Sequence, residues 1–346
     1  MINNNSKIFI CATEQSGDNI GAKIIYNLLK IDNSIIFDGV GGDKMSPFLN
    51  SQYYSLRDFK SLGIIEILFS LKKYISMISF LNKKIIKNNY DLIITIDSPD
   101  FNYPLVKRIK KMNKKIKIVQ IVAPSVWAWR KNRASKFSKV FDELLVLFKF
   151  EIQYFEKYGL KTTFIGHPIY YIDSQINKRS CEKNNLIAFL PGSRVGELDK
   201  LFKYFDLAYL FLLEKFPTTK IFIPTLPHLK TNIENLVKDW KIRPIITDNL
   251  IEIEKFYLDT SKALVCSGTA SLEISKRNIP QLVIYKLNYF TEKILKIFVN
   301  VKYATLLNIF ENKEIINELV NSDLNSEKFI IEFNKLMNNN FLNDKQ

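Results

Sequence analysis

Short apolar runs alternate with amphipathic helical stretches along most of this 346-residue chain. Runs of this length and character are typical of buried strands, and the stretches between them carry apolar residues at helical spacing. The predicted strands are residues 7–12, 35–40, 92–96, 116–122, 144–148 and 163–165, followed by 187–190, 221–223, 244–246, 263–265 and 281–284. Regular alternation of strand and helix predicts an α/β fold, with parallel sheets covered by helices on both faces.

A polar connector, residues 173–185, divides this alternation into two series. The chain is long enough for two domains of ordinary size. We therefore predict two Rossmann-like domains, residues 1–170 and 171–305, followed by helices in residues 306–346 with no further strand. In such folds, ligands bind beyond the carboxyl ends of the strands.

One strand end has the composition of an anion site. Residues 187–198 read Ile-Ala-Phe-Leu-Pro-Gly-Ser-Arg-Val-Gly-Glu-Leu, an apolar strand followed by a turn and a helix. We predict Ser193 as the helix N-cap, with Gly192 in the turn. The first N–H groups of a helix and its dipole attract phosphate, and Arg194 adds a planar cationic fork.

A second strand end repeats this arrangement at residues 264–273. Ser267, Gly268, Thr269 and Ala270 form a turn of small residues that lets backbone N–H groups approach a ligand. We expect Glu273 in the first turn of the following helix. Taken singly, Glu273 would simply complement the helix dipole. Beside two phosphate corners, we interpret it as an acceptor for ribose hydroxyls.

Two loops of the first half carry polar side chains at strand ends. Glu14, Ser16 and Asp18 follow the first strand without the G-x-G-x-x-G spacing, so they fit a substrate hydroxyl or amide better than a dinucleotide. Asp97 directly follows the strand 92–96 and is a candidate general base. We expect Asp100, further into the same loop, to act as a helix cap or turn residue.

The loop 123–130 holds two of the three tryptophans, Trp127 and Trp129, which must pack or hold a ligand. His167 suits packing or hydrogen bonding better than catalysis. The chain has only two histidines and no D-x-D pair, so we predict no metal site and no cofactor. Cys11 and Cys266 lie in strand-like runs, which suits buried free thiols.

The net charge of +15 comes from lysines scattered along the chain. Nucleic-acid binders cluster basic residues with aromatics, and no such motif occurs, so we expect no nucleic-acid partner. Residues 61–87 have a wide apolar face flanked by lysines. That composition fits either a helix in a membrane interface or a helix buried on two sides with snorkelling lysines, and the residues by themselves favour the buried helix.

These motifs together resemble the lipid-A-disaccharide synthase family of inverting glycosyltransferases, over about residues 7–320. The Pro-Ser-Val-Trp-Ala-Trp segment is the most specific. The resemblance is carried by residues 16–18, 39–42, 62–68, 97–102, 124–130 and 166–168 and by the two corners. It implies a two-domain GT-B fold, with the acceptor in the N-terminal half and the UDP-sugar in the C-terminal half.

By this resemblance, UDP-2,3-diacylglucosamine donates its sugar to the 6-hydroxyl of 2,3-diacylglucosamine 1-phosphate (lipid X). The family's base falls on Asp97 and its essential arginine on Arg194. The implied nucleotide-sugar set is Gly192, Ser193, Arg194, Ser267, Gly268, Thr269, Ala270, Glu273 and Asn308. The implied acceptor set is Glu14, Ser16, Gly17, Ser125 and Trp127. The family also implies a cytoplasmic protein on the inner face of the inner membrane, with residues 61–87 facing the lipid.

The chain departs from the family pattern at three places. Thr13 replaces a glycine, Val195 replaces a second arginine, and the segment around Asn308 lacks the family's proline. Two alternatives follow. One is another UDP-sugar GT-B enzyme, such as the peptidoglycan N-acetylglucosaminyltransferase, whose G-G-x-x-G-H loop is missing here. The other is an inactive, membrane-associated binding relative.

Overall fold

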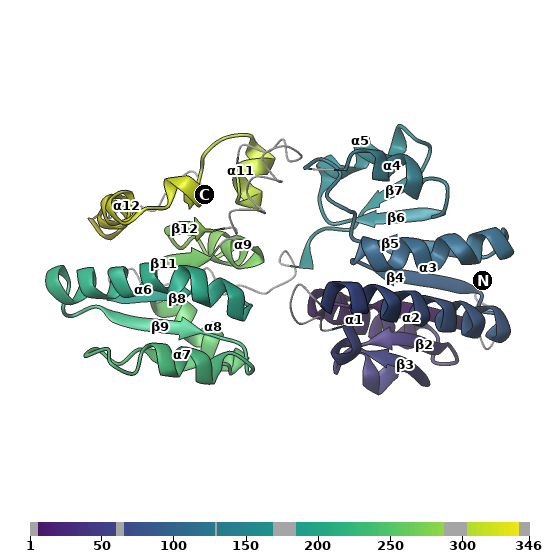
Figure 1. Ribbon diagram of the computed structural model, residues 1–346, viewed down its shortest axis with the longest axis horizontal. Helices are drawn as coiled ribbons and strands as arrows, with labels where there is room; N and C mark the ends of the chain where they lie inside the picture. The colour runs from purple at the N-terminus through teal and green to yellow at the C-terminus, as the bar shows by residue number, and fades with distance from the viewer. Residues whose placement is uncertain are drawn as a thin grey trace. The chain divides into compact units, whose positions relative to one another are not determined.

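The chain divides into two units, Met1–Tyr170 and Tyr171–Gln346, each built around its own parallel sheet (Figure 1). The structure, a computed structural model, describes residues 6–59, 66–128, 130–168, 185–266, 268–286 and 303–338, with the backbone only for residues 66–71.

The sheet of the first unit has seven parallel strands in the order β3-β2-β1-β4-β5-β6-β7. The strands are β1 Lys7–Ala12, β2 Ile36–Gly41, β3 Ser51–Ser55, β4 Leu92–Ile96, β5 Lys117–Ile121, β6 Glu143–Val146 and β7 Lys161–Phe164. The helices are α1 Gln15–Ile31, α2 Glu66–Asn88, α3 Pro99–Met112, α4 Asn132–Phe137 and α5 Ile152–Glu156. Strand β3 was not predicted, because its sequence Ser-Gln-Tyr-Tyr-Ser lacks an apolar run and it lies at the sheet edge.

Each face of this sheet has its own core because strand side chains alternate between faces. On β1, Ile8 and Ile10 belong to the core that contains Ile25 of α1. Phe9 belongs to the opposite core, which contains residues of α2 and α3. This accounts for the unbroken apolar run of β1, since both of its faces are buried.

The sheet of the second unit has six parallel strands in the order β10-β9-β8-β11-β12-β13. The strands are β8 Leu186–Leu190, β9 Lys220–Pro224, β10 Ile245–Thr247, β11 Thr260–Cys266, β12 Gln281–Tyr285 and β13 Asn317–Val320. The helices are α6 Val195–Lys215, α7 Lys230–Leu236, α8 Leu250–Asp259, α9 Thr269–Lys276, α11 Leu306–Glu311 and α12 Ser326–Asn338.

The expectation of no strand after residue 305 was wrong. Strand β13 pairs in parallel with β12, with Val320 opposite Tyr285. The strand has four residues, Asn-Glu-Leu-Val, and is therefore too short and too polar to be recognised as an apolar run. Helix α12 then places Phe329 and Phe333 in the same core as α6. The C-terminal segment is therefore built into the second unit.

Both sheets have the strand order of a Rossmann fold, which confirms the predicted fold class. In the first unit the order reverses between β1 and β4, and in the second between β8 and β11. A crevice opens beyond the carboxyl ends of the strands at such a reversal. The loops that follow these four strands are those singled out in the sequence.

Of the two alternatives considered for residues 61–87, the structure of helix α2 tests only burial in the core. Met77, Leu81 and Ile85 are buried in the core, whereas Ile75 is 59% exposed and Phe80 is 39% exposed. The apolar side chains from residue 62 to residue 71 lie outside the described side chains. No described helix is long and apolar enough to cross a membrane.

Candidate active site

The loop after β4 begins with two residues in a strained backbone conformation. Asp97 has φ 53° and Ser98 has φ 43°, both in the left-handed region that residues with a side chain rarely adopt. Such strain costs on the order of 1–3 kcal/mol per residue and persists only where the surroundings fix it. It concentrates at functional sites, so the loop is a candidate site on backbone geometry as well as on sequence.

Two fully buried amides hold this loop in place. Gln120 of β5 donates from Nε2 to the carbonyls of Asp97 at 3.1 Å, Ile121 at 3.0 Å and Val122 at 3.1 Å. Asn102 of α3 donates to the Asp97 carbonyl at 2.8 Å. Gln120 was not among the predicted site residues, although a glutamine inside the apolar run Lys-Ile-Val-Gln-Ile indicates a buried polar group that needs partners.

The Asp97 carboxylate lies beside Glu14, the N-cap of α1, and Ser16, at the start of that helix. Its Oδ1 accepts a hydrogen bond from the Ser98 N–H at 2.8 Å, and its Oδ2 accepts a long one from the Ser16 hydroxyl at 3.5 Å. Glu14 accepts from the Ser98 hydroxyl at 3.1 Å. Burial first, and then the negative charge of Glu14, raise the pKa of Asp97. A raised pKa suits a carboxylate that must take a proton.

Asp18 and Gly17, which lie near this cluster in α1, have structural roles. Asp18 is fully buried and accepts three backbone N–H bonds, from Gly42 at 2.6 Å, Lys44 at 3.0 Å and Met45 at 3.1 Å. The expectation that Asp18 faces a substrate was therefore wrong. Gly17 is also buried, and an added Cβ would lie 3.2 Å from the Ala12 Cβ, so this glycine lets α1 begin close to β1.

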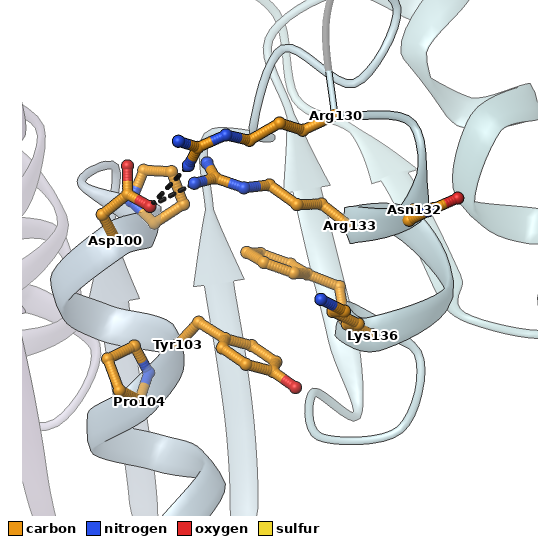
Figure 2. A pocket seen from close by; sticks show the side chains of 9 residues that line it. Asp100, Tyr103, Pro104, Arg130, Asn132, Arg133 and Lys136 are labelled. Atoms are coloured by element: carbon orange, nitrogen blue, oxygen red, sulfur yellow. Dashed lines mark hydrogen bonds and ion pairs between the residues drawn. The ribbon is translucent and has the colours of Figure 1, made fainter.

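Asp100 does not cap α3, contrary to expectation. It lies in the first turn of α3, and its carboxylate forms ion pairs with Arg130, at 3.2 Å, and with Arg133. These residues border a cavity of about 420 Å³, named here the basic cavity, which is lined by Asp100, Tyr103, Arg130, Arg133, Lys136 and Phe137 among others. Figure 2 shows both guanidinium groups extending to the Asp100 carboxylate.

The tryptophan loop packs on an aromatic group. Trp127 contacts Phe150 edge to face, with ring centroids 5.7 Å apart. Phe148 stacks on His167, with ring centroids 5.4 Å apart, which fits the packing role expected of His167. The buried indole N–H of Trp127 has no hydrogen-bond partner of ordinary geometry in the described part of the chain, yet it lies near enough to Glu151 to lower the pKa of that carboxyl. Ser125 is exposed. Trp129 lies outside the described residues.

The corner after β8 differs from the predicted one in two ways: its N-cap residue is not Ser193, and a carboxylate of the chain accepts one of its N–H groups. The N-cap of α6 is Arg194, and Ser193 precedes it. The Glu197 carboxylate folds back, accepting the Ser193 N–H at 2.8 Å and lying 3.4 Å from the Arg194 guanidinium. Gly192, at φ 115°, makes room, since an added Cβ would lie 2.5 Å from Glu197. The Arg194 side chain is 74% exposed.

The corner after β11 brings Gly268, at φ 156°, to the start of α9 at Thr269. Ser267 lies outside the described residues. Glu273 lies in the second turn of α9, one turn later than expected, because the helix begins at Thr269. Burial raises the pKa of Glu273, and the Arg277 cation lowers it. Arg277 itself pairs with Glu254.

Asn308 is fully buried in α11. Its Oδ1 accepts from the N–H groups of Ile315 at 2.7 Å and Ile316 at 2.9 Å. Its Nδ2 donates to the Ile316 carbonyl at 2.8 Å and to Glu318 at 3.2 Å. Glu318 also accepts the Ala304 N–H at 2.8 Å. These bonds connect α11 to β13. The Asn308 side chain therefore positions backbone, and its polar atoms are already used within the chain.

Metal ligation has no support in the described residues, where no three His, Cys, Asp or Glu side chains gather. Cys11 and Cys266 are both buried, and burial raises the pKa of the Cys266 thiol to about 12.

The chain has extensive similarity to known proteins. A family model described as lipid-A-disaccharide synthetase matches residues 8–346. The lipid-A-disaccharide synthase of Acinetobacter baylyi is 31% identical over 350 residues, covering 96% of this chain and 88% of the relative. That of Rickettsia typhi is 32% identical over 349 residues, covering 98% of this chain and 91% of the relative.

Solved structures extend the similarity of fold. The UDP-GlcNAc 2-epimerase from Neisseria meningitidis, solved bound to UDP-GlcNAc, matches with a TM-score of 0.61. The match covers 98% of this chain and 92% of the epimerase at 14% sequence identity, a level at which the likeness concerns the fold.

Proposed function

The chain belongs to the lipid-A-disaccharide synthetase family, and on that premise we propose that Asp97 is the general base of its sugar transfer. The chain is a glycosyltransferase that forms the lipid A disaccharide. Family membership favours this activity over peptidoglycan N-acetylglucosaminyl transfer and over an inactive binding relative. The proposed substrates are UDP-2,3-diacylglucosamine as donor and lipid X as acceptor.

The observation that carries the assignment of the base is the environment of Asp97. Its carboxylate has a raised pKa beside Glu14, and its backbone is strained in a loop fixed by Gln120. Asp97 takes the proton of the acceptor's 6-hydroxyl as that oxygen attacks the anomeric carbon of the donor. The bond from that carbon to the diphosphate oxygen breaks, and its electron pair leaves with UDP. Attack opposite UDP inverts the anomeric centre and gives the β-1,6 linkage.

The leaving diphosphate is assigned to Arg194 and to the corners after β8 and β11. Arg194 is exposed and planar, which suits bidentate contact with phosphate. Because Glu197 accepts the Ser193 N–H, the Arg194 side chain becomes the main donor of the first corner. Thr269, Ala270 and Gly268 supply the second corner, and Glu273 is assigned to the ribose. An epimerase with the same fold was solved with UDP-GlcNAc, which supports a UDP-sugar as the donor.

The acceptor is assigned to the first unit and to the membrane surface. Glu14 and Ser16 lie next to Asp97, with Ser125 and Trp127 on the loop that follows β5. Helix α2 presents exposed Ile75 and Phe80 among lysines, the composition of a helix that rests on anionic lipid.

Disaccharide formation from the two acylated substrates tests this assignment. Asp97→Asn keeps the shape and removes the proton acceptor, so kcat should fall by a factor of ~10²–10⁴ with little change in KM for the UDP-sugar. Asp91→Asn, at the other end of β4, is the matched control and should behave as wild type. Near-normal turnover of Asp97→Asn would remove Asp97 as the base. A larger loss of kcat in Asp100→Asn, with KM for the acceptor unchanged, would move that role to Asp100.

A further inference from the structure

The basic cavity has the charge of an anion site. Of its lining residues, Arg130, Arg133 and Lys136 are cationic and Asp100 is the one carboxylate, which leaves two positive charges in excess. A phosphomonoester carries about −1.5 to −2 at pH 7, so it would balance this excess. Arginine forks also match the geometry of phosphate oxygens.

The positions of the two arginines of the basic cavity are fixed by their surroundings. Arg133 projects from α4, and its side chain is only 16% exposed, held by the ion pair with Asp100. Arg130 has φ 51°, another left-handed residue, so the backbone is strained where it enters the cavity. Tyr103 stacks on Phe137 with ring centroids 5.7 Å apart, which gives the cavity an aromatic wall. Figure 2 shows Tyr103 below the guanidinium groups.

The cavity also lies next to the proposed base. Asp100 follows Asp97 by three residues and lies in the first turn of α3. Pro99, which lines the cavity, follows Asp97 by two residues, and two residues of chain span at most about 7 Å, a separation similar to the width of a sugar ring. An acceptor whose nucleophilic hydroxyl and phosphate lie at opposite ends of one sugar could therefore reach both places.

We propose that the basic cavity binds the phosphoryl group of the acceptor, with Arg133 and Lys136 as its specificity-determining contacts. Asp100 orients the two guanidinium groups toward that position. The inference rests on the proposed function, because it assigns this anion to the acceptor and not to the nucleotide. The site would make the enzyme select phosphorylated over dephosphorylated acceptor.

The test compares two acceptors in steady-state kinetics: lipid X and 2,3-diacylglucosamine without its phosphate. Lys136→Ala and Arg133→Ala should raise KM for lipid X by about 10- to 100-fold, as expected for a lost charge-assisted hydrogen bond. Neither should change KM for the donor or for the dephosphorylated acceptor. Lys139→Ala, an exposed lysine outside the cavity lining, controls for net charge and should match wild type.

A binding measurement complements the kinetics. Calorimetric titration of the full chain with glucosamine 1-phosphate should give weaker binding in Lys136→Ala than in wild type. Lys136 is exposed, so this variant should keep the wild-type melting temperature even if Arg133→Ala does not.

The outcomes separate the two proposals. If wild type transfers sugar but the cavity variants match Lys139→Ala, the cavity inference is wrong and the proposed function stands. Equal changes in KM for both acceptors would also overturn the inference. If folded wild type forms no disaccharide with either acceptor, the proposed function itself fails.

Discussion

Asp18, in the first turn of α1, and Asp97, in the loop after β4, have surroundings that give them different uses. Asp18 accepts three backbone N–H groups in full burial, so its carboxylate is committed to holding residues 42–45. Asp97 accepts one backbone N–H and a long bond from Ser16, and it faces the charge of Glu14. A carboxylate with few donors and a like charge nearby retains the capacity to take a proton.

Glu151 gives a prediction about stability at the same scale. Burial raises the pKa of Glu151 from 4.5 to about 7. Between these values the folded chain holds a proton that the unfolded chain has lost, so the free energy of unfolding falls as pH rises through this window. The full difference is at most about 3 kcal/mol.

Glu151→Gln should remove this contribution, leaving the variant more stable than wild type at pH 8 and similar to it at pH 4.5. Urea denaturation at both pH values measures the difference. Glu156→Gln, an exposed carboxylate in the following helix, serves as control. A wild-type pH dependence in Glu151→Gln would show that Glu151 ionises normally.

Strand β5 controls the loop of its neighbour β4, which leads to a prediction at the scale of elements. Gln120→Leu keeps the volume and removes the three bonds to the Asp97, Ile121 and Val122 carbonyls. Without them the left-handed residues should relax and displace the Asp97 carboxylate. A displacement of about 1 Å costs on the order of 10²-fold in rate, so kcat should fall while KM for the donor stays near normal.

The pH profile distinguishes positioning from mere stability. Burial and the charge of Glu14 raise the pKa of Asp97. If the Asp97 carboxylate moves away from these surroundings in Gln120→Leu, its pKa should fall and the acid limb of kcat/KM should move to lower pH. A variant with a lower melting temperature and an unmoved acid limb would make Gln120 a structural residue only.

The elements that the sequence predicted well are those buried on both faces. Strands such as β4 and β8 are continuous apolar runs because each lies inside its sheet. Strands β3 and β13 escaped prediction because each combines an edge position with a sequence that forms no apolar run. Ser193 was assigned as a cap because the sequence could not show that Glu197 takes its N–H and that α6 starts one residue later.

At the scale of the molecule, topology explains why the site residues could be located but not fully assigned. Strand ends in a parallel sheet meet at one edge, so Asp97 and Glu14 could be expected together from strand order. The ion pairs of Asp100 with Arg130 and Arg133 join helix α3, which follows β4, to the segment that follows β5. Such contacts depend on side-chain directions that no local pattern records.

The net charge of +15 yields a prediction for the whole chain on membranes. Vesicles with anionic lipid should bind it more strongly than zwitterionic vesicles, and raising salt from low to high concentration should weaken the binding, because exposed charges are screened. Contact through apolar side chains is not screened. Vesicle sedimentation across a salt series therefore separates the two contributions.

Helix α2 is where the apolar contribution should arise. Ile75 is 59% exposed, so Ile75→Ser should leave the melting temperature unchanged but lose about 1 kcal/mol of interfacial burial, roughly fivefold in vesicle binding at every salt concentration. Ile31→Ser is the matched control, since Ile31 is 78% exposed at the end of α1 in the same unit. Equal losses in both variants would mean that exposed apolar area anywhere on the unit promotes adsorption. A loss confined to Ile75→Ser identifies α2 as the surface on which the enzyme meets its lipid substrates.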